Sequence, residues 1–95
     1  MIKITQKAQK QIKHILHEQN LSDHHIRVGA RGNEKCMLNF YMGIQKDILP
    51  DDIQYQVGDI SIIMDRISES RMKNVELDYI DIPERSGFVF RSNID

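Results

Sequence analysis

The stretch IQYQVGDISIIM at residues 53–64 is the strongest local signal for the fold in this chain of 95 residues. Apolar and polar side chains alternate on both sides of its central Gly-Asp pair, which is the period of half-buried strands. Gly58 favours a two-residue type II′ turn, because that turn needs a positive φ at its first central position. Such a turn sets Val57 opposite Ile60 and Tyr55 opposite Ile62, so one face of the hairpin is expected to be apolar.

A long amphipathic helix is expected before this hairpin, over residues 6–20. Thr5 is its expected N-cap, since a threonine hydroxyl can accept a hydrogen bond from an unpaired backbone N–H of the first turn. The spacing of apolar residues gives the helix one apolar face and one polar face. The apolar face holds Ala8, Ile12, Ile15 and Leu16, and the polar face holds Lys10, His14, His17 and Glu18.

Most of the remaining chain has the alternation of strands. Strands are expected at residues 2–4, 26–31, 37–44, 75–82 and 88–91, and a short helix at residues 66–73. Asp65 is the expected N-cap of the short helix, Asn74 its expected end, and Pro83–Gly87 the expected link between the last two strands. This order predicts an α+β fold with small, mostly antiparallel sheets, in a single domain over residues 1–95.

The composition argues against several classes of protein. With 13 Lys and Arg against 14 Asp and Glu, the formal net charge of -1 gives no overall attraction to nucleic acid or to an anionic membrane. No apolar run reaches the length of a signal peptide or a membrane helix, so a cytoplasmic protein is expected. The sequence has no phosphate loop, no G-x-S-x-G elbow, no H-E-x-x-H and no C-x-x-C motif, so the residues alone indicate a small α+β domain with one candidate reactive thiol.

Four histidines are candidate metal ligands, with an ordinary surface role as the alternative. His14 and His17 are spaced to approach one metal ion on the surface of the long helix. The adjacent His24 and His25 are expected to point to opposite faces of an extended segment, which suits a shared metal poorly. The solvated surface role is therefore the more frequent one for both pairs.

Basic residues form two further candidate sites. Lysines recur at helix-like intervals and could contact phosphate or an acidic partner; they are Lys3, Lys7, Lys10 and Lys13. No aromatic residue interleaves with them, so nucleic acid is not expected there. Arg27 and Arg31 share one face of a strand, where they could hold an anion or pair with carboxylates, which is the commoner role.

Cys36 is the only cysteine of the sequence, so one chain can form neither an intrachain disulfide nor an all-cysteine metal site. Lys35 beside it favours the thiolate, which is the form that attacks electrophiles and binds metals. On the residues alone, a structural, a nucleophilic, a redox and a metal-binding role stay open for this cysteine.

Several segments, in this order, resemble the HesB-like domain of the A-type iron–sulphur cluster carriers. Ile26-Arg27-Val28-Gly29 is similar to the family strand before its first cysteine, and Cys36 followed by Tyr41 is similar to the family's cysteine and tyrosine. Leu77-Asp78-Tyr79 and Gly87-Phe88-Val89-Phe90 are close to its leucine–aspartate–aromatic and glycine–phenylalanine–x–phenylalanine segments. Cluster-binding members carry a further Cys-Gly-Cys near the C-terminus, which this sequence lacks.

This resemblance implies a HesB-like domain, with its sheets arranged as a sandwich or pseudo-barrel, and a non-enzymatic role in iron–sulphur cluster assembly or iron binding. It implies Cys36 as the cofactor-binding and metal-binding residue, in a homodimer or with a protein partner. A cluster is normally held by four thiolates and one chain supplies one, so a cluster or iron shared between subunits and the absence of any cofactor both stay open. The alternative function is a degenerate HesB-like interaction module with no metal.

Overall fold

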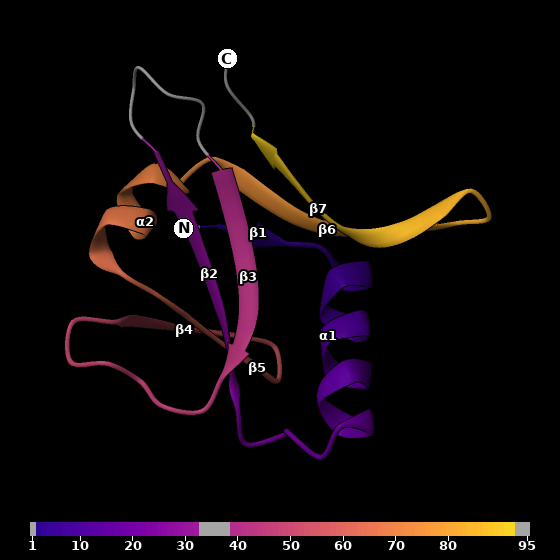
Figure 1. The fold of residues 1–95 in the computed structure, drawn as a ribbon, viewed down its shortest axis with the longest axis horizontal. Coiled ribbons are helices and arrows are strands. Elements are labelled where there is room, and N and C mark those ends of the chain that lie inside the picture. The colour runs from indigo at the N-terminus through magenta and orange to yellow at the C-terminus, as the bar shows by residue number, and fades with distance from the viewer. Residues whose placement is uncertain (1, 33–38, 93–95) are drawn as a thin grey trace.

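The computed structural model describes residues 2–32 and 39–92, and these form two sheets and two helices (Figure 1). In chain order the elements are β1 (Lys3–Ile4), α1 (Gln6–Glu18), β2 (His25–Arg31), β3 (Asn39–Gln45), β4 (Ile53–Val57), β5 (Ile60–Met64), α2 (Arg66–Arg71), β6 (Val75–Ile82) and β7 (Arg85–Ser92). This order confirms the expected α+β fold, with one long N-terminal helix and one short helix.

The strands pair in the orders β1-β6-β7 and β3-β2-β5-β4. Three of the pairs are antiparallel, namely β2–β3, β4–β5 and β6–β7, so the expectation of mostly antiparallel sheets is confirmed. Two further pairs, β1–β6 and β2–β5, are parallel. The sequence analysis did not predict them, because each joins segments that lie far apart along the chain.

The hairpin of β4 and β5 has the predicted register, with Val57 opposite Ile60 and Tyr55 opposite Ile62. Gly58 has a φ of 60°, whereas Asp59 is not among the residues with positive φ. A type I′ turn needs positive φ at both central positions, so these angles agree with the predicted type II′ turn. The hairpin directs Ile60 and Ile62 into the core.

The helix α1 begins as predicted but ends two residues earlier than predicted. Thr5 is its N-cap, and its hydroxyl accepts a hydrogen bond from the Ala8 N–H at 3.2 Å. Of the predicted apolar face, Ile15 is only half-buried, and the other three side chains are buried. The helix ends at Glu18 because Asn20 takes a left-handed conformation with φ 57°, which an asparagine tolerates.

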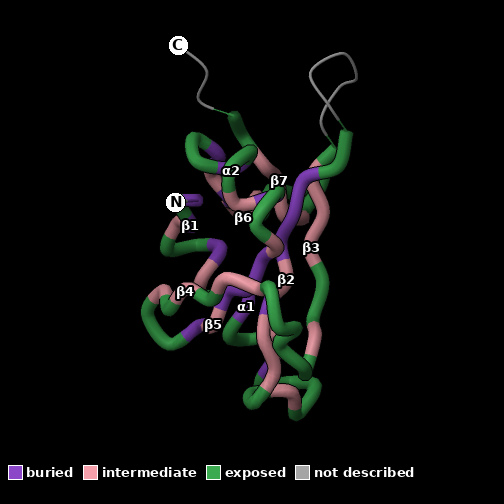
Figure 2. Tube along the Cα trace, turned by 90° about the vertical axis from the view of Figure 1, so that its left-hand side faces the viewer, coloured by how far each residue is buried: buried purple, intermediate pink, exposed green. Residues whose placement is uncertain are grey.

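One core lies between α1 and the inner sides of both sheets, as the buried stretches of the tube in Figure 2 indicate. Its fully enclosed members include Ile62 and Leu77, each with 0% of its surface exposed. The cluster consists of Ile2, Ile4, Ala8, Ile12, Leu16, Ile26, Val28, Ala30, Ile60, Ile62, Met64, Met72, Val75 and Leu77. Both sheets therefore depend on the same buried apolar surface.

The last hairpin is longer than the sequence analysis predicted. The expected link Pro83–Gly87 is wrong, because Ile82 pairs with Arg85 and Gly87 pairs with Ile80 inside the ladder. The turn contains only Pro83 and Glu84, and proline suits the first central position of such a turn because its φ is fixed. The short helix also ends earlier than expected, at Arg71, and of the expected strand at residues 37–44 the first two residues lie outside the described residues.

Candidate functional site at the ends of β2, β3 and β7

Cys36, the predicted ligand, lies outside the described residues, in the connection from β2 to β3. The described ends of these strands are an antiparallel pair in which Arg31 lies opposite Asn39. The two described strand ends that flank residues 33–38 therefore lie side by side, and the residues around them are the described neighbours of this connection in the chain.

Tyr41 packs across β2 next to this connection. A Cβ atom added at Gly29 would lie 2.3 Å from the Tyr41 ring, which is far inside van der Waals contact, so only glycine leaves room for the ring there. The Arg31 guanidinium lies 4.9 Å from the ring centroid, within range of a cation–π interaction. This contact gives a physical reason for the glycine and the tyrosine in the segments that carry the family resemblance. The cation–π contact with Tyr41 is the role that the structure gives to Arg31, which was predicted to bind an anion or a carboxylate.

The end of β7 reaches the same place. The rings of Phe40 on β3 and Phe90 on β7 have centroids 5.4 Å apart and are tilted by 31°. This contact joins the two sheets, and Figure 1 shows the ends of β2 and β7 on the same side of the molecule as the start of β3.

The short helix α2 holds β2 just before the connection. Asp65 caps α2 by accepting from the Ser68 N–H at 2.7 Å, as predicted for this aspartate. The buried Ser68 hydroxyl accepts a hydrogen bond from the Ala30 N–H at 3.0 Å and donates to Asp65 at 3.1 Å. Arg71 donates to the Gly32 carbonyl. Sequence reasoning missed Ser68, since nothing local marks a serine of a short helix as buried.

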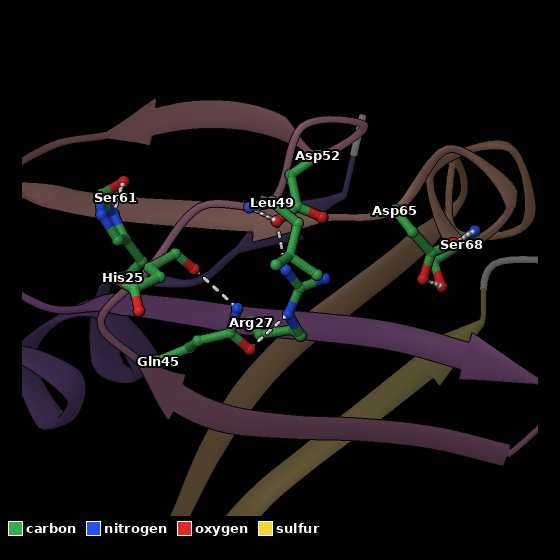
Figure 3. A network of polar contacts seen from close by, with 9 residues as sticks. His25, Arg27, Gln45, Leu49, Asp52, Ser61, Asp65 and Ser68 are labelled. Atoms are coloured by element: carbon green, nitrogen blue, oxygen red, sulfur yellow. Dashed lines mark hydrogen bonds and ion pairs between the residues drawn. The ribbon is translucent and has the colours of Figure 1, made fainter.

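Arg27 forms a half-buried polar network further down β2 (Figure 3). Its guanidinium donates to the Asp52 carboxylate and, through Nε, to the Gln45 side chain at 2.8 Å. The Asp52 carboxylate also accepts from the Leu49 N–H at 2.7 Å. The hydrogen bond from Arg27 lowers the pKa of Asp52, against the opposing effect of burial.

The predicted carboxylate partner of Arg27 is thus found, although it comes from the link between β3 and β4. Only 3% of the Asp52 side chain is exposed, so this ion pair is closed to an external anion. The Arg27–Asp52 ion pair holds the link between β3 and β4 against β2, so its role is structural.

The histidines do not converge on one metal site. His24 contacts Asp23 at 2.8 Å and lowers the pKa of that carboxyl, whereas His25 Nδ1 contacts the Ser61 hydroxyl at 2.6 Å (Figure 3). His14 lies 3.6 Å from Glu18, in a hollow that His17 also lines. Within residues 2–32 and 39–92, no three His, Cys, Asp or Glu side chains are grouped to hold a metal ion.

The donor set of one chain does not fit a complete cluster site. A cluster needs four ligands, usually thiolates, and the sequence has one cysteine. A thiolate from Cys36 fits one ligand position of a site whose other ligands come from outside the chain. No helix in the described ranges is long and apolar enough to cross a membrane.

Comparison with known proteins gives matches along the whole chain. A protein-family model described as iron–sulphur cluster biosynthesis matches residues 1–94. An uncharacterised protein of Synechocystis sp. is 28% identical over 90 residues, which are 95% of this chain and 80% of that protein.

Two solved structures share the fold. The crystal structure of Escherichia coli SufA, involved in the biosynthesis of iron–sulphur clusters, matches with a TM-score of 0.81 at 13% identity, over 96% of this chain and 79% of SufA. A crystal structure of IscA with a 2Fe–2S cluster matches with a TM-score of 0.73 at 15% identity, over 98% of this chain and 83% of IscA. At these identities the likeness concerns the fold.

Proposed function

The chain belongs to the iron–sulphur cluster biosynthesis family, and from this premise we propose that it assists cluster assembly as a non-enzymatic cytoplasmic carrier or accessory protein. In this role Cys36 contributes one thiolate to iron or to a cluster that the chain binds jointly with a second copy or with a partner protein. The observation that carries the proposal is the meeting of three strand ends, of β2, β3 and β7, at the base of the Cys36 connection.

The number of thiolates determines how many ligands must come from outside the chain. A homodimer offers two Cys36 thiolates, so two more ligands must come from glutathione, from other side chains or from a partner. A cluster held in this way has replaceable ligands, which suits a protein that passes the cluster on rather than one that keeps it.

A second candidate function is an interaction module of the same family that binds no metal. The single cysteine favours it, since one chain supplies only one of the four thiolates that normally hold a cluster. In that case Cys36→Ser leaves the protein's interactions unchanged.

Anaerobic reconstitution with ferrous iron and sulphide tests the proposal. Visible absorption and native mass are measured with and without glutathione, for the wild type and for Cys36→Ser. The carrier role predicts a chromophore on a dimer or on a glutathione complex, and its loss in Cys36→Ser.

A relocated thiol is the matched control. The variant Cys36→Ser/Ser70→Cys keeps one cysteine per chain but moves it to an exposed position on α2. The proposal predicts that this variant stays colourless. A colourless wild type, or a relocated thiol that restores the chromophore, supports the module without metal instead.

A further inference from the structure

Two hollows flank the exposed side of α1, and His14 lines both. One has a volume of about 380 Å³, lies between α1 and β6, and is lined by Lys7, Lys10, Gln11, His14, Tyr79 and Asp81. The other has a volume of about 430 Å³ and is lined by Lys13, His14, Leu16, His17, Ser22 and Asp59. Figure 1 shows the hairpin of β6 and β7 extending past the first turn of α1. Tyr79 and Asp81 of β6 form the strand side of the first hollow.

The first hollow holds positive charge that no ion pair within the described residues neutralises. Lys7 and Lys10 are exposed, and neither forms an ion pair with any residue in the described ranges 2–32 and 39–92. Asp81 lines the same hollow, yet no ion pair joins its carboxylate to either lysine. The hollow therefore presents the ammonium groups of Lys7 and Lys10 on its helix side and the Asp81 carboxylate, a hydrogen-bond acceptor, on its strand side.

The second hollow differs in its charge. Lys13 and Asp59 already form an ion pair at 2.8 Å, with both side chains largely exposed. The positive charge available to a ligand is thus concentrated on the first half of α1, at Lys7 and Lys10.

We propose that this side of α1 binds an acidic segment of a partner protein. Lys7 and Lys10 contact its carboxylates, Tyr79 packs against one of its apolar side chains, and Asp81 accepts a hydrogen bond from a free backbone N–H of its first helical turn. At 13 residues α1 is roughly 20 Å long, which accommodates a helix of equal length lying alongside it. The inference goes beyond the role of Cys36 and holds whether or not that cysteine binds metal.

The same chemistry disfavours a nucleic acid in this place. The Asp81 carboxylate lines the first hollow, and a phosphodiester backbone has no N–H or O–H donor on its phosphates to offset the repulsion from it. Tyr79 is the one Phe, Tyr or Trp side chain among the described residues that line the two hollows, too few for a run of stacked bases. A peptide, in contrast, supplies both N–H donors for the aspartate and carboxylates for the lysines.

The test uses a fluorescein-labelled synthetic peptide of the same length as α1, with glutamate and leucine on one helical face. Its affinity for the full chain is measured by fluorescence anisotropy, and its position by amide chemical shifts of the ¹⁵N-labelled protein. A peptide with every glutamate replaced by glutamine is the ligand control. We expect the shifts to concentrate on α1, Tyr79 and Asp81, and the glutamine peptide to bind at least about tenfold more weakly.

Charge reversal on the protein gives the decisive comparison. Lys7→Glu/Lys10→Glu is expected to weaken binding at least about tenfold, because both cations become repulsive. Lys46→Glu/Lys73→Glu changes the net charge equally at exposed lysines outside the hollows and is expected to weaken it less than about threefold. If the reversed chain does not fold by circular dichroism, Lys7→Gln/Lys10→Gln replaces it, with an expected loss of about threefold or more.

Repeating the titration with Cys36→Ser separates this inference from the proposed function, since the peptide affinity is expected to stay unchanged even where metal binding is lost. Equal losses in the two charge-reversed variants, or amide shifts away from α1, would overturn the inference. Tighter binding of a single-stranded oligonucleotide, lost in Lys7→Glu/Lys10→Glu, would assign the surface to nucleic acid and overturn it too.

Discussion

At the scale of single residues, the Asp78 carboxylate connects segments that lie far apart in the sequence, and no sequence motif indicates this role. Its carboxylate accepts hydrogen bonds from the Thr5 hydroxyl at 2.6 Å, from Arg91 at 2.6 Å and from the Tyr79 N–H at 2.8 Å. The first of these donors, followed by Arg91 and the Tyr79 N–H, lowers the pKa of Asp78 from 3.8 to about 2. One side chain of β6 thus connects the N-cap of α1 to β7.

This carboxylate should make stability depend on pH in a defined interval. Its folded pKa lies below its unfolded value, so its contribution is fully present above about pH 4 and is lost as the pH falls towards about 2. We expect the urea midpoint of the wild type to exceed that of Asp78→Asn above this interval, and the difference to shrink across it. Circular dichroism at a series of pH values measures both midpoints.

Asp81→Asn is the control for the Asp78 experiment, since Asp81 is exposed and forms no ion pair within the described residues. The difference in urea midpoint between Asp81→Asn and the wild type is expected to stay constant with pH. A difference for Asp78→Asn that is equally independent of pH would contradict the assignment to Asp78.

At the scale of elements, α2 replaces a neighbouring strand for the second half of β2. The parallel pairing of β2 with β5 covers only Ile26 and Arg27, and beyond it the Ala30 N–H donates to the Ser68 hydroxyl instead. The short helix α2 therefore hydrogen-bonds to β2 beyond the pairing with β5, and it holds this strand in position up to the start of the Cys36 connection.

Ser68→Ala should remove this support. The Ala30 N–H would then be buried without an acceptor, at a cost of about 1–3 kcal/mol in the free energy of unfolding. We expect faster hydrogen exchange at the Ala30 amide, measured residue by residue by NMR. The control Ser70→Ala changes an exposed serine of the same helix and should alter stability by less than about 0.5 kcal/mol. Unchanged protection of Ala30 in Ser68→Ala would contradict this role.

The elements also show what the sequence could predict and why. The hairpin at residues 53–64 and the cap at Thr5 depend on neighbours in sequence, and both were predicted correctly. The pairing of β1 with β6 depends on residues about seventy positions apart, which no local pattern encodes. Gly87 was read as part of a loop, although it pairs with Ile80 inside a strand, because a single glycine is compatible with both.

The candidate site was predictable only in part. The sequence singled out Cys36, which lies outside the described residues, so its role stays a prediction. Gly29 and Tyr41 were visible as members of two segments that carry the resemblance, but their contact across β2 needed the register of β3. The cations at Lys7 and Lys10 were visible as a stripe, whereas Tyr79 and Asp81 facing them come from a strand that folds back much later in the chain.

At the scale of the whole molecule, the two sheets meet at the Phe40–Phe90 contact as well as in the shared core. Tilted aromatic pairs at this separation contribute about 0.5–1.5 kcal/mol beyond their buried area. The contact therefore couples the stability of one sheet to that of the other.

A double-mutant cycle with Phe40→Leu and Phe90→Leu should measure this coupling, with an interaction free energy of about 0.5–1.5 kcal/mol from urea unfolding. Phe90→Leu combined with Ile67→Ala, at an exposed position of α2, is the control and should be additive. Additive effects of the two phenylalanine variants would show that the sheets are stabilised independently of this contact.

The parallel pairing of β1 with β6 has a consequence for the order of events on the ribosome. Thr5 and Asp78 are 73 positions apart, and synthesis at 5–20 residues per second separates their appearance by roughly 4 to 15 s. During that interval the apolar face of α1 lacks part of its buried cover, since Leu77 and the rest of β6 do not yet exist. The nascent chain thus exposes the apolar face of this amphipathic segment until β6 has been synthesised.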